Sequence, residues 1–205
     1  MGRPNRCAIR AAKLTALGLV MYASVGLTQS ISGASTPAQT STTAEGIRLY
    51  MQMHAVLSHP RCVNCHPRDD TPKQGVDQHI HSPPITRGPQ DRGPLGLSCA
   101  ACHTGANYNP AGVPGAPDWH LAPASMAWEG KSASELCHSL VDRSKNGNRD
   151  LQATVKHLTE DKLVAREWDP GISVYGKPRE AVPLPKAEFN GIVIAWAKSG
   201  GTCPD

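Results

Sequence analysis

Apolar residues recur at helical spacing in several separate stretches of the chain. The first stretch predicts a helix from about Ala44 to Leu57 that ends before Pro60. Its predicted apolar face carries Ile47, Tyr50, Met51 and His54. A second helix should begin at the capping box formed by Ser132 and Glu135 and continue through Val141.

Two more helices are predicted near the C-terminus. Asp150 can cap the first, whose apolar positions are Leu151, Val155 and Leu158. The second should have Pro185 at its first position and end at Gly200-Gly201, because proline favours the first turn and glycine follows helix ends. Its predicted buried positions are Phe189, Ile192, Val193 and Trp196. Since no segment shows a clear strand pattern, the predicted fold class is mostly α with long irregular loops.

Residues 67–123 form one long loop-rich stretch between these helices. Turn-forming pairs recur along it, at Pro83-Pro84, Gly88-Pro89, Gly93-Pro94 and Pro114-Gly115. An irregular stretch of this length is uncommon inside a compact domain unless it has a function. We therefore expect this part of the chain to wrap a cofactor.

The composition leaves little material for a core made of side chains alone. The chain of 205 residues has 4 Trp, 4 Tyr and 1 Phe, against 19 Gly and 18 Pro. Such a balance is short of large apolar residues for a compact domain of this size. We expect a single domain over residues 44–205, with something other than side chains filling much of its core.

The N-terminal residues 1–34 predict an export signal. Basic residues up to Lys13 precede an uncharged apolar run from Leu14 to Leu27, which is short for a membrane span. The small residues Ser32 to Ala34 offer a cleavage site, and residues 35–43 are predicted to be a flexible tether. Cleavage would give a periplasmic protein with no membrane span, whereas an uncleaved signal would remain as a membrane anchor.

Removal of the signal changes the charge of the chain. Residues 1–34 hold four of the 21 basic residues and no acidic residue, so 17 basic and 17 acidic residues remain. The exported chain is formally neutral. Its charge therefore gives no reason to expect a nucleic acid as a partner.

Four of the later cysteines form two copies of one motif. Cys62-Val63-Asn64-Cys65-His66 and Cys99-Ala100-Ala101-Cys102-His103 are both C-x-x-C-H, the attachment pattern of c-type haem. On a helical turn, two thiols at this spacing can bond to the haem vinyl groups while the histidine faces the iron. The motifs predict two covalent haem c groups, held by Cys62, Cys65, Cys99 and Cys102, with His66 and His103 as proximal iron ligands.

Other sites also use paired cysteines. A zinc site of four thiols needs no histidine directly after each pair, and it is unusual in an oxidising compartment. A thioredoxin-like redox site needs a strand before the motif and a helix after it, whereas both copies here lie among Pro and Gly. Haem also accounts for the thin core, because each macrocycle adds a flat apolar surface. Only 37 residues separate Cys62 from Cys99, so the two haems should lie near each other in one fold.

The second axial ligand of each iron is open at this point. Met126 follows Pro123 and lies 60 residues beyond His66, which is similar to the Pro-x-x-Met loop of small class I cytochromes. It could equally be a core methionine. The other candidates are His81, on the loop between the motifs, and His157, on a helical face. The choice matters because methionine raises a haem potential relative to histidine.

Two cysteines beyond the predicted signal lie outside the motifs. Cys137 is on the helix that follows the capping box, and Cys203 comes just after the last helix. In an exported chain, such a pair predicts a disulfide that joins the C-terminal helices. The alternative is that Cys137-His138 is the remnant of a haem site with a single thioether.

With these residues in place, the chain resembles small exported di-haem c-type cytochromes. More narrowly, it is similar to bacterial proteins labelled isoquinoline 1-oxidoreductase subunit. The resemblance rests on HPRCVNCHP (59–67), RGPLGLSCAACH (92–103), PGAPDWHLAP (114–123) and the closing Gly201-Thr202-Cys203-Pro204 after Trp196. It implies one cytochrome c-like domain wrapped around two haems. It also implies a redox partner protein, such as a molybdenum hydroxylase or another dehydrogenase, because this chain lacks the cofactor motifs of such an enzyme.

Two functions are compatible with these features. In the first, the protein is a periplasmic carrier that passes single electrons from a dehydrogenase or hydroxylase toward the respiratory chain, and it is not itself an enzyme. In the second, it is a peroxidase-like di-haem enzyme with one iron open to substrate. The short spacing of the motifs favours the carrier. The sixth ligand decides between them, because a vacant iron is needed for catalysis.

Overall fold

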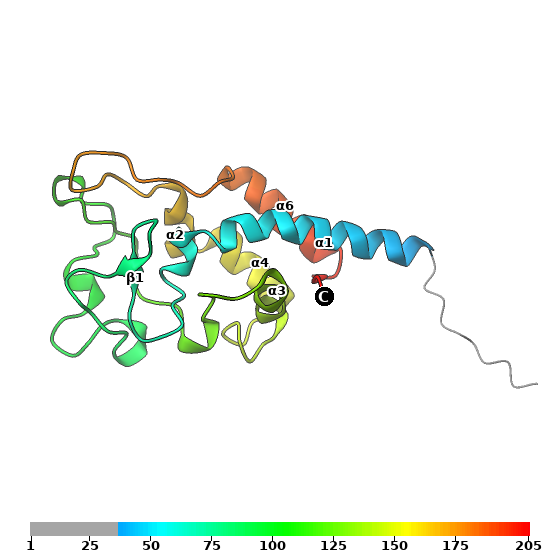
Figure 1. Ribbon diagram of the computed structural model, residues 1–205, viewed down its shortest axis with the longest axis horizontal. Helices are drawn as coiled ribbons and strands as arrows, with labels where there is room; N and C mark the ends of the chain where they lie inside the picture. The colour runs from blue at the N-terminus through cyan, green and yellow to red at the C-terminus, as the bar shows by residue number, and fades with distance from the viewer. Residues whose placement is uncertain (1–36) are drawn as a thin grey trace, which may run out of the picture. The chain divides into compact units, whose positions relative to one another are not determined.

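The computed structural model describes residues 37–205, and it is mostly helical, as predicted (Figure 1). The longer helices are α1 (Pro37–Leu57), α3 (Ala133–Val141), α4 (Leu151–Glu160) and α6 (Lys186–Lys198). The shorter elements are α2 (Pro60–Val63), α5 (Lys162–Ala165), β1 (Lys73–Gln74), β2 (His79–Ile80), and the 3-10 turns η1 (Pro89–Asp91), η2 (Cys99–Ala101), η3 (Asn109–Ala111), η4 (Ala124–Met126) and η5 (Arg166–Trp168).

The predicted helix starts are confirmed for α3 and α4. The Ser132 hydroxyl accepts from the Glu135 backbone N–H (3.2 Å), and the Glu135 carboxylate accepts from the Ser132 N–H (2.8 Å). The Asp150 carboxylate accepts from the Ala153 N–H (2.8 Å) at the start of α4. Each cap satisfies donors that a helix terminus would otherwise leave unpaired. The last helix, α6, starts one position later than predicted, because Pro185 is its cap.

The structure differs from the prediction in the first helix. α1 begins at Pro37, so a helix occupies most of the segment predicted to be a flexible tether. Helix formation is cooperative, so the packed half of α1 can extend toward the N-terminus through the exposed residues Thr42 to Glu45. On the buried face, Tyr50 is fully buried as predicted, but Met51 is 45% exposed and the fully buried methionine is Met53. The correct buried face of α1 is Gly46, Leu49, Tyr50, Met53, Val56 and Leu57.

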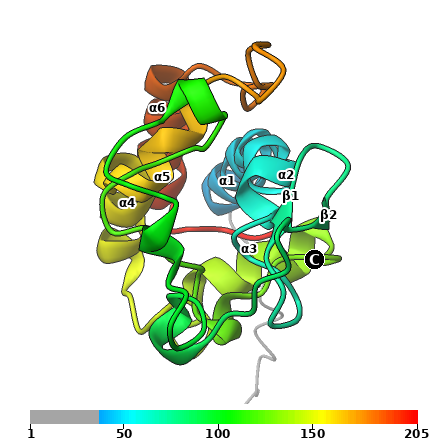
Figure 2. The same cartoon turned by 90° about the vertical axis from the view of Figure 1, so that its left-hand side faces the viewer.

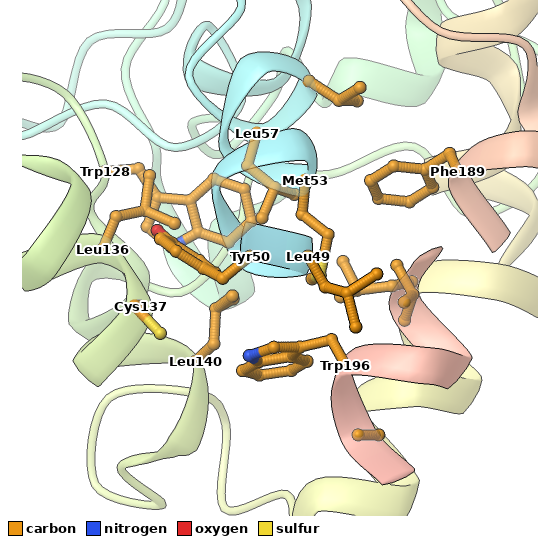
Figure 3. Close-up of a cluster of buried hydrophobic side chains, with 14 of the residues drawn as sticks. Leu49, Tyr50, Met53, Leu57, Trp128, Leu136, Cys137, Leu140, Phe189 and Trp196 are labelled. Carbon is orange, nitrogen blue, oxygen red and sulfur yellow. The ribbon is translucent and has the colours of Figure 1, made fainter. Parts of the chain in front are cut away.

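The core is made of side chains from four helices (Figure 3). The fully buried Trp196 and Phe189 of α6 and Tyr50 of α1 supply much of its volume. The smaller core residues include Leu136 and Leu140 of α3 and Leu158 of α4. The expectation that cofactors would have to provide the core is therefore wrong for this half of the domain, because the few aromatic residues are concentrated here. Trp128 and the partly buried Cys62 also contact this core, and they connect it to the first haem motif.

Helices α1 and α6 lie against each other in the core (Figure 1). Gly46 of α1 allows the turn after α6 to approach closely, since a Cβ atom at this position would lie 2.7 Å from the Ser199 hydroxyl. The C-terminal segment is also fixed by the Trp196 indole, which donates to the Thr202 carbonyl (2.9 Å).

Residues 67–123 are largely irregular, as predicted, apart from one small antiparallel pair of strands that the sequence did not predict. β1 pairs with β2 in the register Lys73↔Ile80 and Gln74↔His79, and β1 lies beside α2 (Figure 2). Strands of two residues are too short to produce an alternating pattern in the sequence. The pairing continues to His81, whose N–H donates to the Pro72 carbonyl (3.0 Å), so the hairpin positions this histidine.

A disulfide joins Cys137 of α3 to Cys203, as predicted from the sequence. The two residues are 66 positions apart, so the bond closes a loop that contains the second half of α3 together with α4, α5 and α6. Cys137 is fully buried in the core. The bond therefore ties the C-terminal end of the chain to the helical half of the domain.

Replacing Cys137 and Cys203 together with alanine should lower the free energy of unfolding by about 4 kcal/mol, because the unfolded chain regains the entropy of this loop. Urea denaturation followed by circular dichroism would measure the loss. A thiol reductant should produce a similar loss in the wild-type protein and leave the variant unchanged. Equal midpoints for the variant and the wild-type protein would contradict the prediction.

The predicted signal at residues 1–34 lies outside the described residues. From Pro37 to the C-terminus, no helix combines the length and the apolar character that a membrane crossing requires.

Candidate functional site

Both C-x-x-C-H motifs are wound into a single helical turn. In the first, the His66 N–H donates to the Val63 carbonyl (2.9 Å) directly after α2. In the second, the Cys102 and His103 N–H groups both donate to the Cys99 carbonyl, at 3.2 and 2.9 Å. All four motif thiols are free. This is the local geometry in which two thiols and a histidine can reach one ligand.

The ring of His66 is fixed by two contacts. Its Nδ1 atom lies 2.7 Å from the Met126 carbonyl oxygen, and its ring stacks on Trp128 at 3.6 Å between centroids and 8° between planes. Since a carbonyl can only accept, Nδ1 must carry the proton in this contact. The other nitrogen, Nε2, is then an acceptor that is free to bind a metal ion.

The ring of His103 repeats this arrangement. Its Nδ1 atom lies 2.7 Å from the Pro114 carbonyl oxygen, and its ring stacks on Trp119 at 4.1 Å and 5°. Outside the motifs themselves, the sequences around His66 and His103 are not alike, so local similarity does not explain why both rings have the same contacts. Each motif histidine is thus held with a carbonyl behind it, a tryptophan alongside it and Nε2 unbound.

Burial keeps both histidines neutral. It lowers the pKa of His66 to about 3 and also lowers the pKa of His103, because the charged imidazolium loses its hydration. Neutral imidazole is the form that binds metals. Burial likewise raises the pKa of Cys65 to about 12, with further contributions from the charges of Glu167 and Cys99.

The first motif opens into a cavity of about 340 Å³. Cys62, Cys65 and His66 line it, and so do two of the predicted distal ligands, Met126 and His157. The apolar part of its wall comes from Leu158, Leu163, Val164, Trp168 and Phe189. Cofactor sites are typically concave, apolar cavities of this kind with a few polar groups.

Met126 and His157 contribute different groups to this cavity. The Met126 carbonyl bonds to His66 Nδ1, which places its backbone behind the ring that would bind the iron, and its sulfur lies 3.7 Å from Arg149 Nη1. His157 has Nδ1 at 3.3 Å from the Asp161 carboxylate. Burial lowers the pKa of His157 and so favours the neutral imidazole. A carboxylate on one ring nitrogen leaves the other available as a ligand.

The third candidate, His81, lies next to His103. Their ring centroids are 5.8 Å apart, with an angle of 64° between the planes. Two imidazoles bound on opposite sides of one metal ion, at about 2 Å each, would have centroids roughly 6 Å apart. His81 Nδ1 lies 2.9 Å from the Pro83 carbonyl, so its Nε2 is also free to bind. The structure thus brings together a pair that the sequence named only as separate candidates.

A buried cluster of charges lies between the two motifs. The Glu167 carboxylate contacts Arg61 Nε at 2.9 Å and Arg166 Nη1 at 3.0 Å. Burial raises the pKa of Glu167, while the guanidinium groups of Arg166 and Arg61 act in the opposite direction. We name these three residues the Arg61–Glu167–Arg166 cluster.

The sequence analysis missed the two stacked tryptophans and this cluster. Trp128 lies 62 positions after His66, but Trp119 lies only 16 positions after His103, so no common spacing reveals the pairs. Only the composition could have indicated these tryptophans. The chain has few aromatic residues, and yet a tryptophan occurs in the segment after each motif. Nothing in the sequence pairs Arg61 with Glu167, which is 106 positions away.

Replacing Gly115 with alanine should weaken the second site. A Cβ atom at this position would lie 2.5 Å from the Thr104 carbonyl oxygen and closer still to that of Ala106. These carbonyls belong to the three residues that follow His103, and Gly115 adjoins the Pro114 carbonyl that holds His103. We expect lower thermal stability and less than the wild-type content of covalent haem, measured by pyridine haemochrome absorbance. Gly105→Ala is the control, because its Cβ would enter open space, and equal losses in both variants would contradict the prediction.

Comparison of the chain with protein-family models, with curated proteins and with solved structures found no match.

Proposed function

We propose that the protein is a periplasmic di-haem c-type cytochrome that carries electrons between a dehydrogenase or hydroxylase and the respiratory chain. The observation that carries this proposal is the repeated arrangement of His66 and His103, each behind two cysteines on a helical turn, with Nδ1 on a carbonyl and Nε2 free. One such arrangement could result from packing alone. Two matching arrangements in one small domain favour the same binding role for both motifs.

The residues present fit two covalently bound haems. Cys62 and Cys65 would hold the first, inside the apolar cavity, and Cys99 and Cys102 would hold the second. When bound, each haem supplies the one-electron redox chemistry of its iron. The chain holds the proximal histidines in one tautomer, keeps them neutral and surrounds the first haem with apolar walls.

The surroundings of the distal candidates favour a histidine on each iron. His81 is at the right separation from His103 to be the second ligand of that site. His157 lies in the cavity of the first site with Nδ1 beside Asp161, whereas the Met126 backbone lies behind His66. We propose His81 and His157 as the distal ligands. With both irons fully ligated, the protein is a carrier, and the peroxidase-like alternative loses the open iron that it needs.

The second site is the better candidate for exchange with a partner. Cys102 is exposed, and the neighbouring Leu95 and Leu97 are 90% and 44% exposed. Apolar groups around a reactive edge are common at transient interfaces. We propose that a redox partner, such as a molybdenum hydroxylase or another dehydrogenase, meets the protein at this site.

Visible absorption spectra test this function. The protein would be exported by a host with intact haem-attachment machinery and measured oxidised, reduced with dithionite, and reduced under carbon monoxide. We expect two low-spin c-type haems per chain that do not bind carbon monoxide. A high-spin component that binds carbon monoxide would favour the enzyme, and a colourless protein would overturn the cytochrome proposal in favour of another use of the thiols, such as zinc.

A further inference from the structure

The Arg61–Glu167–Arg166 cluster is buried from solvent. The exposed fractions of the three side chains are 11%, 7% and 9%. Surface ion pairs contribute little because water screens them, but charges removed from water act on their surroundings at a low effective dielectric constant. The cluster can therefore influence groups on either side of it.

One end of the cluster faces the first haem site. Glu167 and Arg61 line the same cavity as Cys62 and Cys65. Burial raises the pKa of both thiols, and the charge of Glu167 raises it further, whereas the charges of Arg61 and Arg166 act in the opposite direction. The two guanidinium contacts are charge-assisted hydrogen bonds that favour the ionised form of the carboxylate.

The other end faces the second haem site. The Arg166 guanidinium lies over the Trp119 ring, with Cζ 4.5 Å from its centroid, and Trp119 stacks in turn on His103. The charge of Arg166 also lowers the pKa of His103. Arg166 Nε is buried without a hydrogen-bond partner. The cluster holds two guanidinium groups against one carboxylate, so it carries an excess positive charge.

Other charged groups surround the cluster but are placed differently. Arg179 donates to the carbonyls of Pro170 and Ile172 (3.1 and 2.8 Å) and contacts no carboxylate among the described side chains. Glu180 lies 3.6 Å from His59 and is 64% exposed, so water screens its charge. This makes Glu180 a natural control for Glu167.

We propose that the Arg61–Glu167–Arg166 cluster is an electrostatic bridge that moves the reduction potentials of the two haems apart. This inference rests on the proposed cytochrome function. An oxidised haem iron carries one more positive charge than a reduced iron. Beside the first haem, the Glu167 carboxylate offsets the positive charge of Arg61 and so keeps the potential lower than Arg61 alone would. Beside the second haem, the Arg166 guanidinium stabilises the reduced state and raises the potential. The electron then rests on the second haem, at the exposed site.

Redox titration of the intact di-haem protein tests the bridge. Glu167→Gln keeps the shape and hydrogen-bonding capacity of the side chain but removes its charge, and it should move one potential to a more positive value. Arg166→Gln should move the other potential to a more negative value. Arg166→Lys keeps the charge, so its potential should stay close to the wild-type value. Glu180→Gln should leave both potentials unchanged.

The outcomes separate this inference from the proposed function. A wild-type protein without c-type haem would refute the function itself. A di-haem protein whose potentials do not respond to these substitutions, or move together by the same amount, would refute the bridge alone. If Glu167→Gln holds too little haem to be titrated, the comparison of Arg166→Gln with Arg166→Lys still decides the question, because only the loss of charge should lower a potential.

Discussion

Replacing Cys62 and Cys65 together with alanine is expected to leave a protein with half the wild-type content of covalent haem. Both thioether bonds to the first haem would be lost, while the second motif would keep its own. Pyridine haemochrome absorbance per mole of protein, together with the intact mass, would measure the change. Cys99→Ala with Cys102→Ala should also halve the haem content.

The two double variants should differ in stability. The first haem would fill a cavity of about 340 Å³ that is continuous with the core through Trp128 and Cys62, so its loss leaves apolar walls without contacts. The second motif is more exposed, since Cys102 is at the surface. We expect the larger drop in melting temperature for the variant of the first motif. Equal drops, or full haem content in either variant, would contradict the proposed sites.

The residues predicted well from the sequence are those whose signal is local. The helical turn expected at each C-x-x-C-H motif needs only five adjacent positions, and the cap residues Ser132 and Asp150 act within one helical turn. The disulfide was accessible by elimination, because Cys137 and Cys203 were the two later cysteines outside the motifs. The turns and caps depend only on neighbouring residues, and a disulfide can form only between cysteines.

The features that were missed depend on tertiary contacts. The buried face of α1 is set by the positions of α6 and α3. Because apolar residues occur on several sides of this helix, the sequence did not show that Met53 would be buried and Met51 exposed. The pairing of His81 with His103 depends on the register of a hairpin only two residues long. The cluster around Glu167 joins residues that no spacing relates. Sequence could propose ligands, but only the fold could say which pairs of residues meet.

Replacing His81 or His157 with alanine should each produce one haem that binds carbon monoxide. Removal of a distal ligand leaves that iron with an open position, so one of the two haems should become high-spin and the other should remain low-spin. Absorption spectra of the reduced protein, with and without carbon monoxide, would show a response from half of the haem. The double variant should respond fully.

Met126→Leu is the matched control for these ligands. It keeps a buried apolar side chain and the backbone carbonyl that bonds to His66, and it removes only the sulfur. We expect both haems of this variant to stay low-spin and indifferent to carbon monoxide. If Met126→Leu opens an iron and His157→Ala does not, the first haem has a methionine ligand and a higher potential than two histidines would give. The direction proposed for the electron would then reverse, because the first haem and not the second would hold it more tightly.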